Sequence, residues 1–329
     1  MGPRQVKLTK ALGYKRKAER VWRWLIKNLS ANDVLGIVFA LSSALSTAGN
    51  RVLLSKPLTY SNPRFTTYVA SIVGVLVIFL IDVFTGQTAL LASTPFLIII
   101  LFSVVGVLNS GLSRILLYLA IRELGANQAE SLQPTAVLFS LVFAVLLLHE
   151  RLGLDTLFGG ILIVVGSFLV EGRLSSSVRR GSFKVGVASA LLSSLVFAFV
   201  LILIKAGLST SYPFVSATLI SAVAALGFNS FVYNPKRLQS DIKTIPKSGL
   251  FSIVSAAVLI GLAQVLRYGA FSYTNVVVVS PLIGTSPVLV VVLTRIFAKS
   301  YEVAHWKTAL SVVFVVLGAA IISYYSGLG

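Results

Sequence analysis

Three ionisable side chains lie deep within long apolar segments of this 329-residue chain: Arg114, Glu130 and Arg267. A charged group inside a hydrocarbon layer costs free energy, so such a residue is by default a candidate for function. Each arginine has a tyrosine close by, since Tyr118 follows Arg114 by one helical turn and Tyr268 directly follows Arg267. Arginine and tyrosine offer flat contact surfaces together with hydrogen-bond donors. The two pairs therefore predict a cavity that binds a small anionic or zwitterionic molecule. The alternative is that the two arginines act at successive stages instead of holding one molecule.

Glu130 is the acidic group that we expect beside Arg114. Arg114 lies near the end of the third apolar segment and Glu130 near the start of the fourth, with a turn around Gly125 between them. We expect the two side chains to pair across this hairpin. One interpretation is a permanent ion pair that holds the hairpin together. The other is a functional group that releases Arg114 or a proton during a transport cycle.

Prolines interrupt two of the apolar segments. Pro134 lies in the fourth segment, and Pro281 and Pro287 lie in the ninth. A proline inside a helix removes the hydrogen bond to the carbonyl four residues earlier. The polar residues beside these prolines are Gln133, Thr285 and Ser286. We expect them to line one widening of the helix bundle, and the alternative is that the kinks only improve packing.

Residues that enzymes use for covalent or metal chemistry are sparse. The chain has no cysteine, and its two histidines, His149 and His305, lack the spacing of a zinc site. Its serines have no plausible histidine and aspartate partners, and no phosphate-cradling glycine loop is present. We therefore predict no catalytic residues, no metal and no cofactor. His149 and Glu150, at the end of the fourth segment, are interpreted as loop or helix-capping residues.

The composition predicts a membrane protein. The chain is 56% apolar and 12% charged, with a mean hydropathy of +0.92, whereas soluble domains carry roughly a quarter charged residues. A helix needs about 20 apolar residues to cross a bilayer. Ten segments approach this length: Leu35–Leu54, Phe65–Val83, Phe96–Ala120, Ala129–Leu148, Leu154–Val170, Val185–Ile204, Phe214–Phe231, Leu250–Tyr273, Val276–Phe297 and Val303–Tyr325. Because these runs lack the alternation of barrel strands, we predict an all-α integral membrane protein with ten transmembrane helices.

The second half of the chain repeats the first at an almost constant offset of 150 residues. Matches that chance similarity between apolar segments does not explain are Gly36 and Gly186, Ser43 and Ser193, Pro63 and Pro213, Ser71 and Ser221, Gly111 and Gly261, and Tyr118 and Tyr268. After a small insertion, Glu150 and Gly166 match Glu302 and Gly318. In the same register Arg114 corresponds to Gln264, which adds Gln264 to the candidate binding residues.

Five segments per copy is an odd number, so the second copy enters the membrane from the opposite side, as in many secondary transporters. We predict two inverted five-helix repeats, at residues 32–172 and 183–329. A basic tail at 1–31 precedes them, and a basic linker at 173–182 joins them. Small residues recur at every fourth position in the first and sixth segments: Gly36, Ala40, Ala44 and Ala48, and Gly186, Ala190, Ser194 and Ala198. Such stripes allow close packing of helix backbones.

Positive charge gathers in the tail and the loops. The net charge is +18, and nine of the 28 Lys and Arg residues lie between Arg4 and Lys27. Basic segments beside a membrane attract anionic headgroups, so we expect anionic lipid as a partner of the tail, and no nucleic acid. A homodimer is kept open. The tail favours an N-terminus inside the cell, whereas the short loops favour both termini outside, so charge leaves the orientation open.

The segment from Gly106 to Val170 resembles the EamA repeat of the drug/metabolite transporter (DMT) superfamily. That repeat has a glycine-rich third span ending near Tyr-x-Ala, a proline in the fourth span, and a Glu-Arg-Leu turn before a glycine-bearing fifth span. The matching residues are Tyr118, Ala120, Pro134, Glu150, Arg151, Leu152, Gly159, Gly160 and Gly166. The second copy matches more loosely, through Tyr268, Ala270, Pro287, Glu302 and Gly318.

The resemblance implies a multi-pass transporter of the cell membrane with both termini cytoplasmic. It also implies a central cavity lined mainly by spans three, four, eight and nine, alternating access, and usually metabolite export. One departure is that Val69 and Ala70 lie where many relatives carry an arginine, and Arg64 lies at the helix entrance instead. We expect a secondary transporter that exports small polar metabolites. The alternative is a non-transporting membrane scaffold or an intramembrane enzyme.

Overall fold

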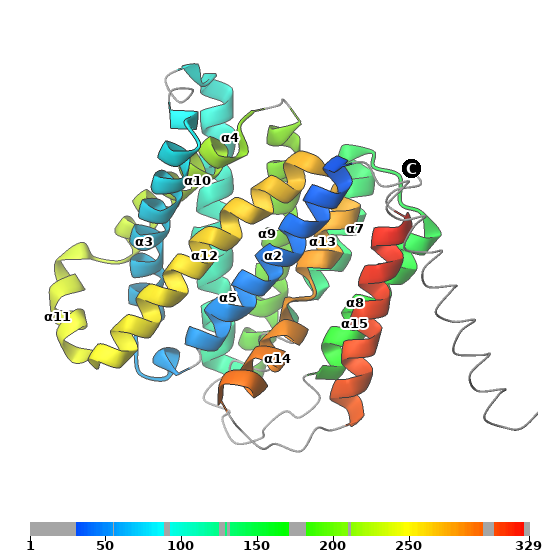
Figure 1. Cartoon of the computed structure of the whole chain (residues 1–329). Helices are drawn as coiled ribbons and strands as arrows, with labels where there is room; N and C mark the ends of the chain where they lie inside the picture. The colour runs from blue at the N-terminus through cyan, green and yellow to red at the C-terminus, as the bar shows by residue number, and fades with distance from the viewer. Residues whose placement is uncertain are drawn as a thin grey trace, which may run out of the picture.

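The computed structural model of the chain describes residues 31–54, 56–88, 93–124, 129, 132–170, 182–209, 212–298 and 306–325. Every regular element within these ranges is a helix (Figure 1). The predicted all-α membrane fold is confirmed. The basic tail, the linker, Glu130 and Glu302 lie outside the described residues, so the expected lipid contact of the tail stays a prediction.

The first repeat contains α2 (Ala31–Leu54), α3 (Pro63–Phe84), α4 (Phe96–Gly106), the π-helix η3 (Val107–Ser113), α5 (Arg114–Leu124), α7 (Thr135–Leu148) and α8 (Leu154–Val170). The second contains α9 (Phe183–Leu208), α10 (Phe214–Val232), α11 (Leu238–Thr244), α12 (Lys247–Tyr273), α13 (Val276–Ile283), α14 (Ser286–Ala298) and α15 (Trp306–Tyr325). Short 3-10 helices, η1 (Pro57–Thr59) and η4 (Pro235–Arg237), precede α3 and α11.

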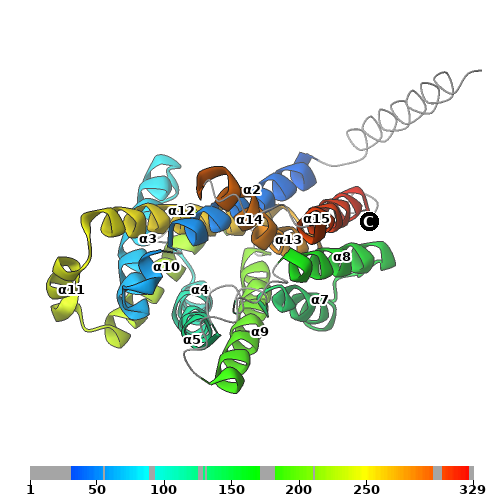
Figure 2. The same cartoon turned by 90° about the horizontal axis from the view of Figure 1, so that it is seen from below.

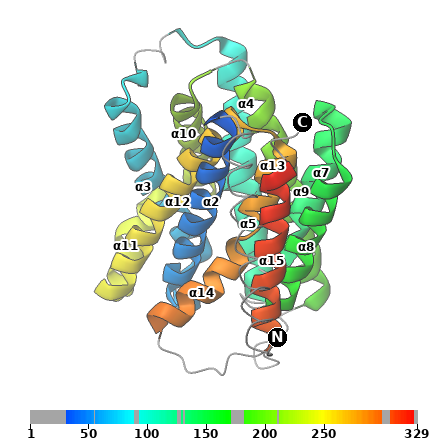
Figure 3. The same cartoon turned by 45° about the vertical axis from the view of Figure 1, so that its right-hand side comes forward.

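Within the described ranges, six helices are long and apolar enough to cross a membrane: Ala31–Leu54, Pro63–Phe84, Phe96–Ala120, Phe183–Leu208, Phe214–Val232 and Lys247–Tyr273. Four shorter apolar helices lie at Thr135–Leu148, Leu154–Ser167, Val276–Val290 and Leu310–Tyr325. Together they correspond to the ten predicted segments. The fourth and ninth spans depart from a single long helix because of their prolines. Figures 1 and 3 show the bend between α13 and α14.

Local sequence sets several helix ends. At the start of α3, the Asn62 side chain accepts the N–H of Arg64 at 3.0 Å, and Pro63 takes a position where its missing N–H costs nothing. α7 begins directly after Pro134 and is followed by the C-cap residue His149, whose φ of 55° is left-handed. Pro134, which the sequence predicts as a helix break, thus lies directly before the start of α7.

Contacts between the repeats recur at equivalent positions. Ser43 Oγ of α2 donates to the carbonyl of Ala263 of α12 at 2.8 Å. Ser193 Oγ of α9 donates to the carbonyl of Ser113, in the third span, at 2.8 Å. The offset of 150 residues converts Ser43 to Ser193 and Ser113 to Ala263. The two repeats therefore pack on each other through the same hydrogen bond, made twice.

Steric contacts follow the same symmetry. A Cβ at Gly36 would lie 2.7 Å from the methyl of Thr274, and a Cβ at Gly186 would overlap Leu124. Thr274 and Leu124 are themselves repeat equivalents. The stripes of small residues are buried in both α2 and α9, which allows α2 to pack on α12 and α9 to pack on α5.

The fifth and tenth spans form a second contact between the repeats. A Cβ at Gly159 of α8 would lie 2.8 Å from the carbonyl oxygen of Gly318 of α15. Nearby, Ser311 Oγ donates to the Gly166 carbonyl at 2.6 Å. Figure 2 shows α8 and α15 side by side, on the opposite side of the molecule from α3, α10 and α11. Between these groups lie the helices that carry the candidate site.

Candidate transport site

Arg267 is a buried cation between the repeats. Its side chain is 5% exposed on α12, and its guanidinium carbon lies 5.1 Å from the ring centroid of Phe197 on α9. A cation over an aromatic face is stabilised by the negative face of the ring. The buried Nε has no hydrogen-bond partner, and within the described ranges no carboxylate is bonded to this arginine. Arg267 therefore retains a donor for a ligand.

Two further cations act on Arg267, namely Arg114 and Arg51. Arg114 is the first residue of α5, and Arg51 lies in the last turn of α2. Like charges repel strongly where water is scarce. An anion bound among these arginines would lower that repulsion. That Arg114 and Arg267 hold one molecule stays a prediction.

A π-helix positions Arg114. The wider turn covers Val107–Ser113, and Asn109, Ser110 and Ser113 are buried in it. Short π-helical turns inside α-helices are frequent at functional sites. Gly106 makes room at its start, because a Cβ there would overlap the backbone of Ser221 on α10. Apolar periodicity could not reveal the π-helix, because one wider turn within a long apolar segment leaves no separate pattern.

The tyrosines differ in their surroundings. Tyr118 is partly exposed and interacts electrostatically with Arg114, as the helical spacing predicts. Tyr268 is fully buried, its hydroxyl lies 2.7 Å from Ser221 Oγ, and its ring centroid lies 5.9 Å from that of Phe102. The hydroxyl of Tyr268 is therefore already hydrogen-bonded to Ser221, and its ring packs against Phe102. Phe197, by contrast, is the aromatic partner of Arg267.

The two proline-containing spans contact each other. The hydroxyls of Ser140 on α7 and Ser280 on α13 are hydrogen-bonded, and a Cβ at Gly284 would lie 2.6 Å from Val137. The break in the ninth span falls at Gly284 and Thr285, between α13 and α14. Pro281 lies inside α13 and Pro287 at the start of α14, so the break occurs between the two prolines.

The polar residues beside the breaks have different partners. Gln133 has a buried Nε2 without a hydrogen-bond partner. Thr285 Oγ1 donates to the carbonyl of Leu282 at 2.7 Å, and Ser286 is buried. Gln264 is buried on α12, one turn before Arg267. Glu130 lies outside the described residues, so its expected pairing with Arg114 stays a prediction.

Two charged residues, Lys205 and Glu150, form hydrogen bonds with the turn between α12 and α13. Neither was predicted as a binding residue. Lys205 Nζ of α9 donates to the carbonyls of Phe271 at 3.1 Å and Thr274 at 3.0 Å. Glu150, from the loop before α8, accepts the N–H groups of Val276 and Val277 at 3.0 Å each. The capping role expected for Glu150 is confirmed, although the capped helix belongs to the other repeat. The helix dipole favours a positive charge such as Lys205 at the C-terminal end of α12, and a negative charge such as Glu150 at the N-terminal end of α13.

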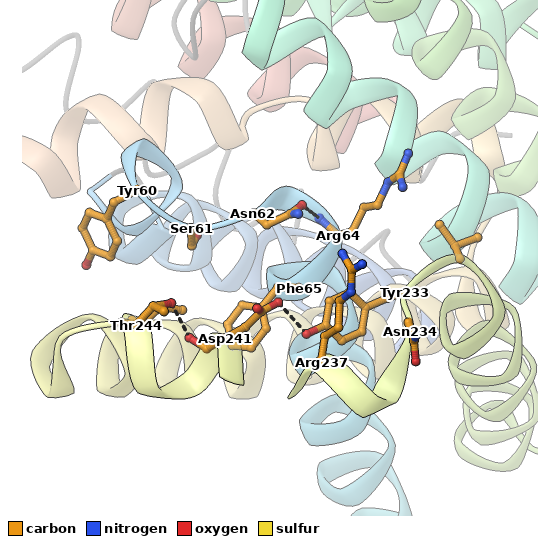
Figure 4. A pocket seen from close by; sticks show the side chains of 12 residues that line it. Tyr60, Ser61, Asn62, Arg64, Phe65, Tyr233, Asn234, Arg237, Asp241 and Thr244 are labelled. Carbon is orange, nitrogen blue, oxygen red and sulfur yellow. Dashed lines mark hydrogen bonds between the residues drawn. The ribbon is translucent and has the colours of Figure 1, made fainter. Parts of the chain in front are cut away.

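A cavity of about 370 Å³ lies away from the predicted residues, between the start of α3 and the connection from α10 to α11 (Figure 4). Arg64 and Arg237 line it together with Tyr233 and Asp241. The Tyr233 hydroxyl donates to Asp241 Oδ2 at 2.7 Å. Burial, followed by this hydrogen bond, raises the pKa of Tyr233 above its usual range. Arg64, which lies at the start of α3 and not further along the second span as in many relatives, thus lines this cavity.

Comparisons with known proteins agree with this architecture. The EamA-like transporter family matches the chain twice, over residues 34–172 and 184–324. An uncharacterised transporter of Methanothermobacter thermautotrophicus is 38% identical over 66 residues, which are 20% of this chain and 19% of that protein. A protein crystal structure superposes with a TM-score of 0.70 over 90% of this chain and 97% of that one, at 15% identity. The last similarity shows a shared fold.

Proposed function

The chain belongs to the EamA-like transporter family, and from this premise we propose that it exports small polar metabolites as a secondary transporter. The cargo we propose carries a carboxylate, a phosphate or another anionic group. It is translocated by alternating access, as the two repeats rock against each other in the cell membrane. We propose that both termini lie in the cytoplasm, as the resemblance implies.

The observation that carries the choice of cargo is the buried guanidinium of Arg267. Its Nε is without a hydrogen-bond partner and its face lies on Phe197. Within the described residues, the charges that act on it are those of Arg114 and Arg51. Hydrogen bonds between a guanidinium and an anion are stronger than those between neutral groups. A buried group with open donor capacity and excess positive charge supports binding of an anion.

The broken spans support movement. α7 and α13 each begin or bend near a proline and touch across the interface between the repeats. Interrupted helices in corresponding parts of two inverted repeats are common at transporter sites. A non-transporting scaffold would not require a buried guanidinium whose Nε lacks a hydrogen-bond partner at this interface, and this supports transport over a scaffold role.

Transport by purified protein in sealed liposomes tests the proposal. Uptake of a radiolabelled mixture of amino acids, dicarboxylates and sugar phosphates should exceed that of protein-free liposomes. Arg267→Ala should lower uptake at least tenfold, because a lost charge-assisted hydrogen bond costs about 1.5–3 kcal/mol. Arg267→Lys should remain well below the wild type, since an ammonium does not reproduce the stacked planar guanidinium.

Lys184→Ala is a suitable control, because Lys184 is an exposed cation in the first turn of α9, the helix that carries Phe197. It should leave uptake unchanged. Equal uptake by the wild type and Arg267→Ala would reject the assigned site. No uptake of any component by the wild type would count against the proposed cargo class.

A further inference from the structure

The cavity between the start of α3 and the connection from α10 to α11 offers more positive than negative charge (Figure 4). Its charged lining residues are Arg64, Arg237 and Asp241. The Asp241 carboxylate already accepts the hydroxyl of Tyr233 through Oδ2, at 2.7 Å. Within the described ranges, neither guanidinium group is bonded to a carboxylate. The two arginines therefore keep their N–H donors for a ligand.

Two asparagines that line the cavity also offer donors. Asn62 Oδ1 accepts the backbone N–H of Arg64 at 3.0 Å, and Asn234 Oδ1 accepts the backbone N–H of Lys236 at 3.1 Å. Each asparagine precedes a proline that begins a helix, so these bonds are helix caps. A side-chain amide has one carbonyl oxygen and one NH₂ group. Because capping occupies the oxygens, the asparagines present their NH₂ groups to a ligand that accepts hydrogen bonds.

Packed aromatic side chains bound the cavity. Tyr233 is 5% exposed, and its ring centroid lies 6.1 Å from that of Phe65 and 5.0 Å from that of Tyr68. α3 and α10 are therefore in contact beside the cavity. The lining residue Tyr60 packs against α12, where a Cβ at Gly249 would overlap its hydroxyl. These contacts fix the walls of the cavity without filling it.

The two arginines come from different repeats. Arg64 lies in the first turn of α3, and Arg237 ends η4. Figure 4 shows both at the same end of the cavity, with Tyr60 and Thr244 at the other end. The Arg64 side chain extends away from α11 in this view, but it is exposed, and exposed side chains change rotamer within nanoseconds. A bound anion would draw the two guanidinium groups together, against their mutual repulsion.

The cavity lies where the membrane meets water. α3 begins and α10 ends beside it, and both helices are long and apolar enough to cross a membrane. Lys236 and Lys243, in the same connection as Arg237, are exposed. Phe231, which precedes the lining residue Val232, is 91% exposed, as expected of a side chain in contact with acyl chains. Cations at this level attract the phosphate groups of lipid headgroups.

A phosphate group matches these donors. Arginine binds phosphate oxygens in pairs, through parallel N–H donors. The volume of about 370 Å³ lies in the lower part of the range of small-molecule sites, roughly 300–1,000 Å³, which suits a headgroup or a small organic phosphate. We propose that Arg64 and Arg237 bind one phosphate group in this cavity, from a phospholipid headgroup or a soluble phosphate compound. The bound phosphate links the two repeats at this end of the bundle, apart from the transport site around Arg267.

Native mass spectrometry of the purified full-length protein tests the site without any cargo. The probes are phosphatidylglycerol and glycerol phosphate, and diacylglycerol with the same acyl chains is the reference without phosphate. The wild type should retain one more phosphate-bearing molecule than the Arg64→Gln, Arg237→Gln double variant. This variant should bind about tenfold more weakly or worse, because charge-assisted hydrogen bonds are lost. Binding of phosphatidylglycerol alone identifies a lipid headgroup as the source, and binding of glycerol phosphate identifies a soluble compound.

The Lys236→Gln, Lys243→Gln double variant is the matched control. It removes the same charge from the same side of the bundle, and neither lysine is among the residues that line the cavity. It should bind the probes as the wild type does. Equal weakening in both double variants would show diffuse attraction to a basic surface and would overturn the site. Binding of neither probe by the wild type, or equal binding of diacylglycerol, would overturn it as well.

Arginine labelling checks the same site in the unaltered protein. Phenylglyoxal modifies accessible arginine side chains, and peptide mapping gives the extent of modification at each position. The bound probe should protect Arg64 and Arg237 but not Arg151, an exposed arginine in the loop before α8. Unchanged labelling of Arg64 and Arg237 in the presence of both probes would contradict the proposal. None of these measurements involves transport, so their outcome is independent of the proposed function.

Discussion

Four buried or half-buried charged groups differ in how completely the protein satisfies them. Lys205 donates to two carbonyls, and Glu150 accepts two amide N–H groups. Arg267 packs on the ring of Phe197, but its Nε has no hydrogen-bond partner. Asp82 accepts a hydrogen bond from Ser216 through one oxygen, and its other oxygen has no partner. Buried polar groups in native proteins are nearly always satisfied. The first two residues therefore fit structural roles, and Arg267 fits the proposed binding role.

At the residue scale, Glu150→Gln tests the structural assignment. A glutamine offers one acceptor oxygen, and its NH₂ group would face the N–H of Val276 or Val277. We expect a loss of about 1–3 kcal/mol in unfolding free energy, because a charge-assisted hydrogen bond is lost and a donor is left unsatisfied. Thermal unfolding in detergent measures it. Asp155→Asn, an exposed acid, is the control, and similar melting temperatures for the two variants would contradict the role of Glu150.

The third span and α10 approach each other at backbone level. The π-helix of the third span meets α10 where a Cβ at Gly106 would overlap the Ser221 carbonyl, and where Asn229 Nδ2 donates to the Ser110 carbonyl at 3.2 Å. A backbone in contact with backbone cannot yield by changing a rotamer. The position of Arg114, directly after this π-helix, therefore depends on the contact with α10.

At the element scale, Gly106→Ala should displace α10 from the third span. Overpacking in a tight contact costs about 1–3 kcal/mol, so we expect lower thermal stability and weaker cargo uptake. Gly227→Ala is a matched control on α10, because a Cβ there would meet nothing within 4 Å. Thermal unfolding and liposome uptake of both variants provide the measurement. Wild-type stability in Gly106→Ala would show that the contact tolerates a methyl group.

For the whole molecule, transport by rocking requires relative movement of the two repeats. Ser140 and Ser280 join α7 of the first repeat to α13 of the second through their hydroxyls. The chain contains no cysteine, so an introduced pair would be its only thiols.

Oxidation of the Ser140→Cys, Ser280→Cys double variant should therefore stop transport, because a disulfide would fix the two repeats together. Uptake into liposomes before and after oxidation measures the effect, and a reductant should restore it. The single variants control for oxidation itself. Full transport by the cross-linked protein would contradict rocking at this contact.

The sequence predicted the fold well because the length of the apolar segments and the offset of 150 residues can be read directly from the order of residues. The ten spans and the close packing at Gly36 and Gly186 follow from such patterns. That Glu150 caps α13, a helix of the other repeat, could not be read from its own helix end. The isolation of Asp82 could not be predicted, because an acid near the end of an apolar segment resembles an ordinary interfacial residue. Only tertiary contacts show that it is buried, just as they show that Tyr268 is packed against Phe102.

The contact between α8 and α15 bears on how such a molecule could arise. Gly159 meets Gly318, and Gly166 meets Ser311, and each pair is the repeat equivalent of the other. Such a surface is self-complementary, as in a two-fold symmetric dimer. Two separate copies of a single ancestral repeat, inserted into the bilayer in opposite orientations, could already have met through it. Gene fusion would then have linked partners that fitted each other beforehand, with no new interface to invent.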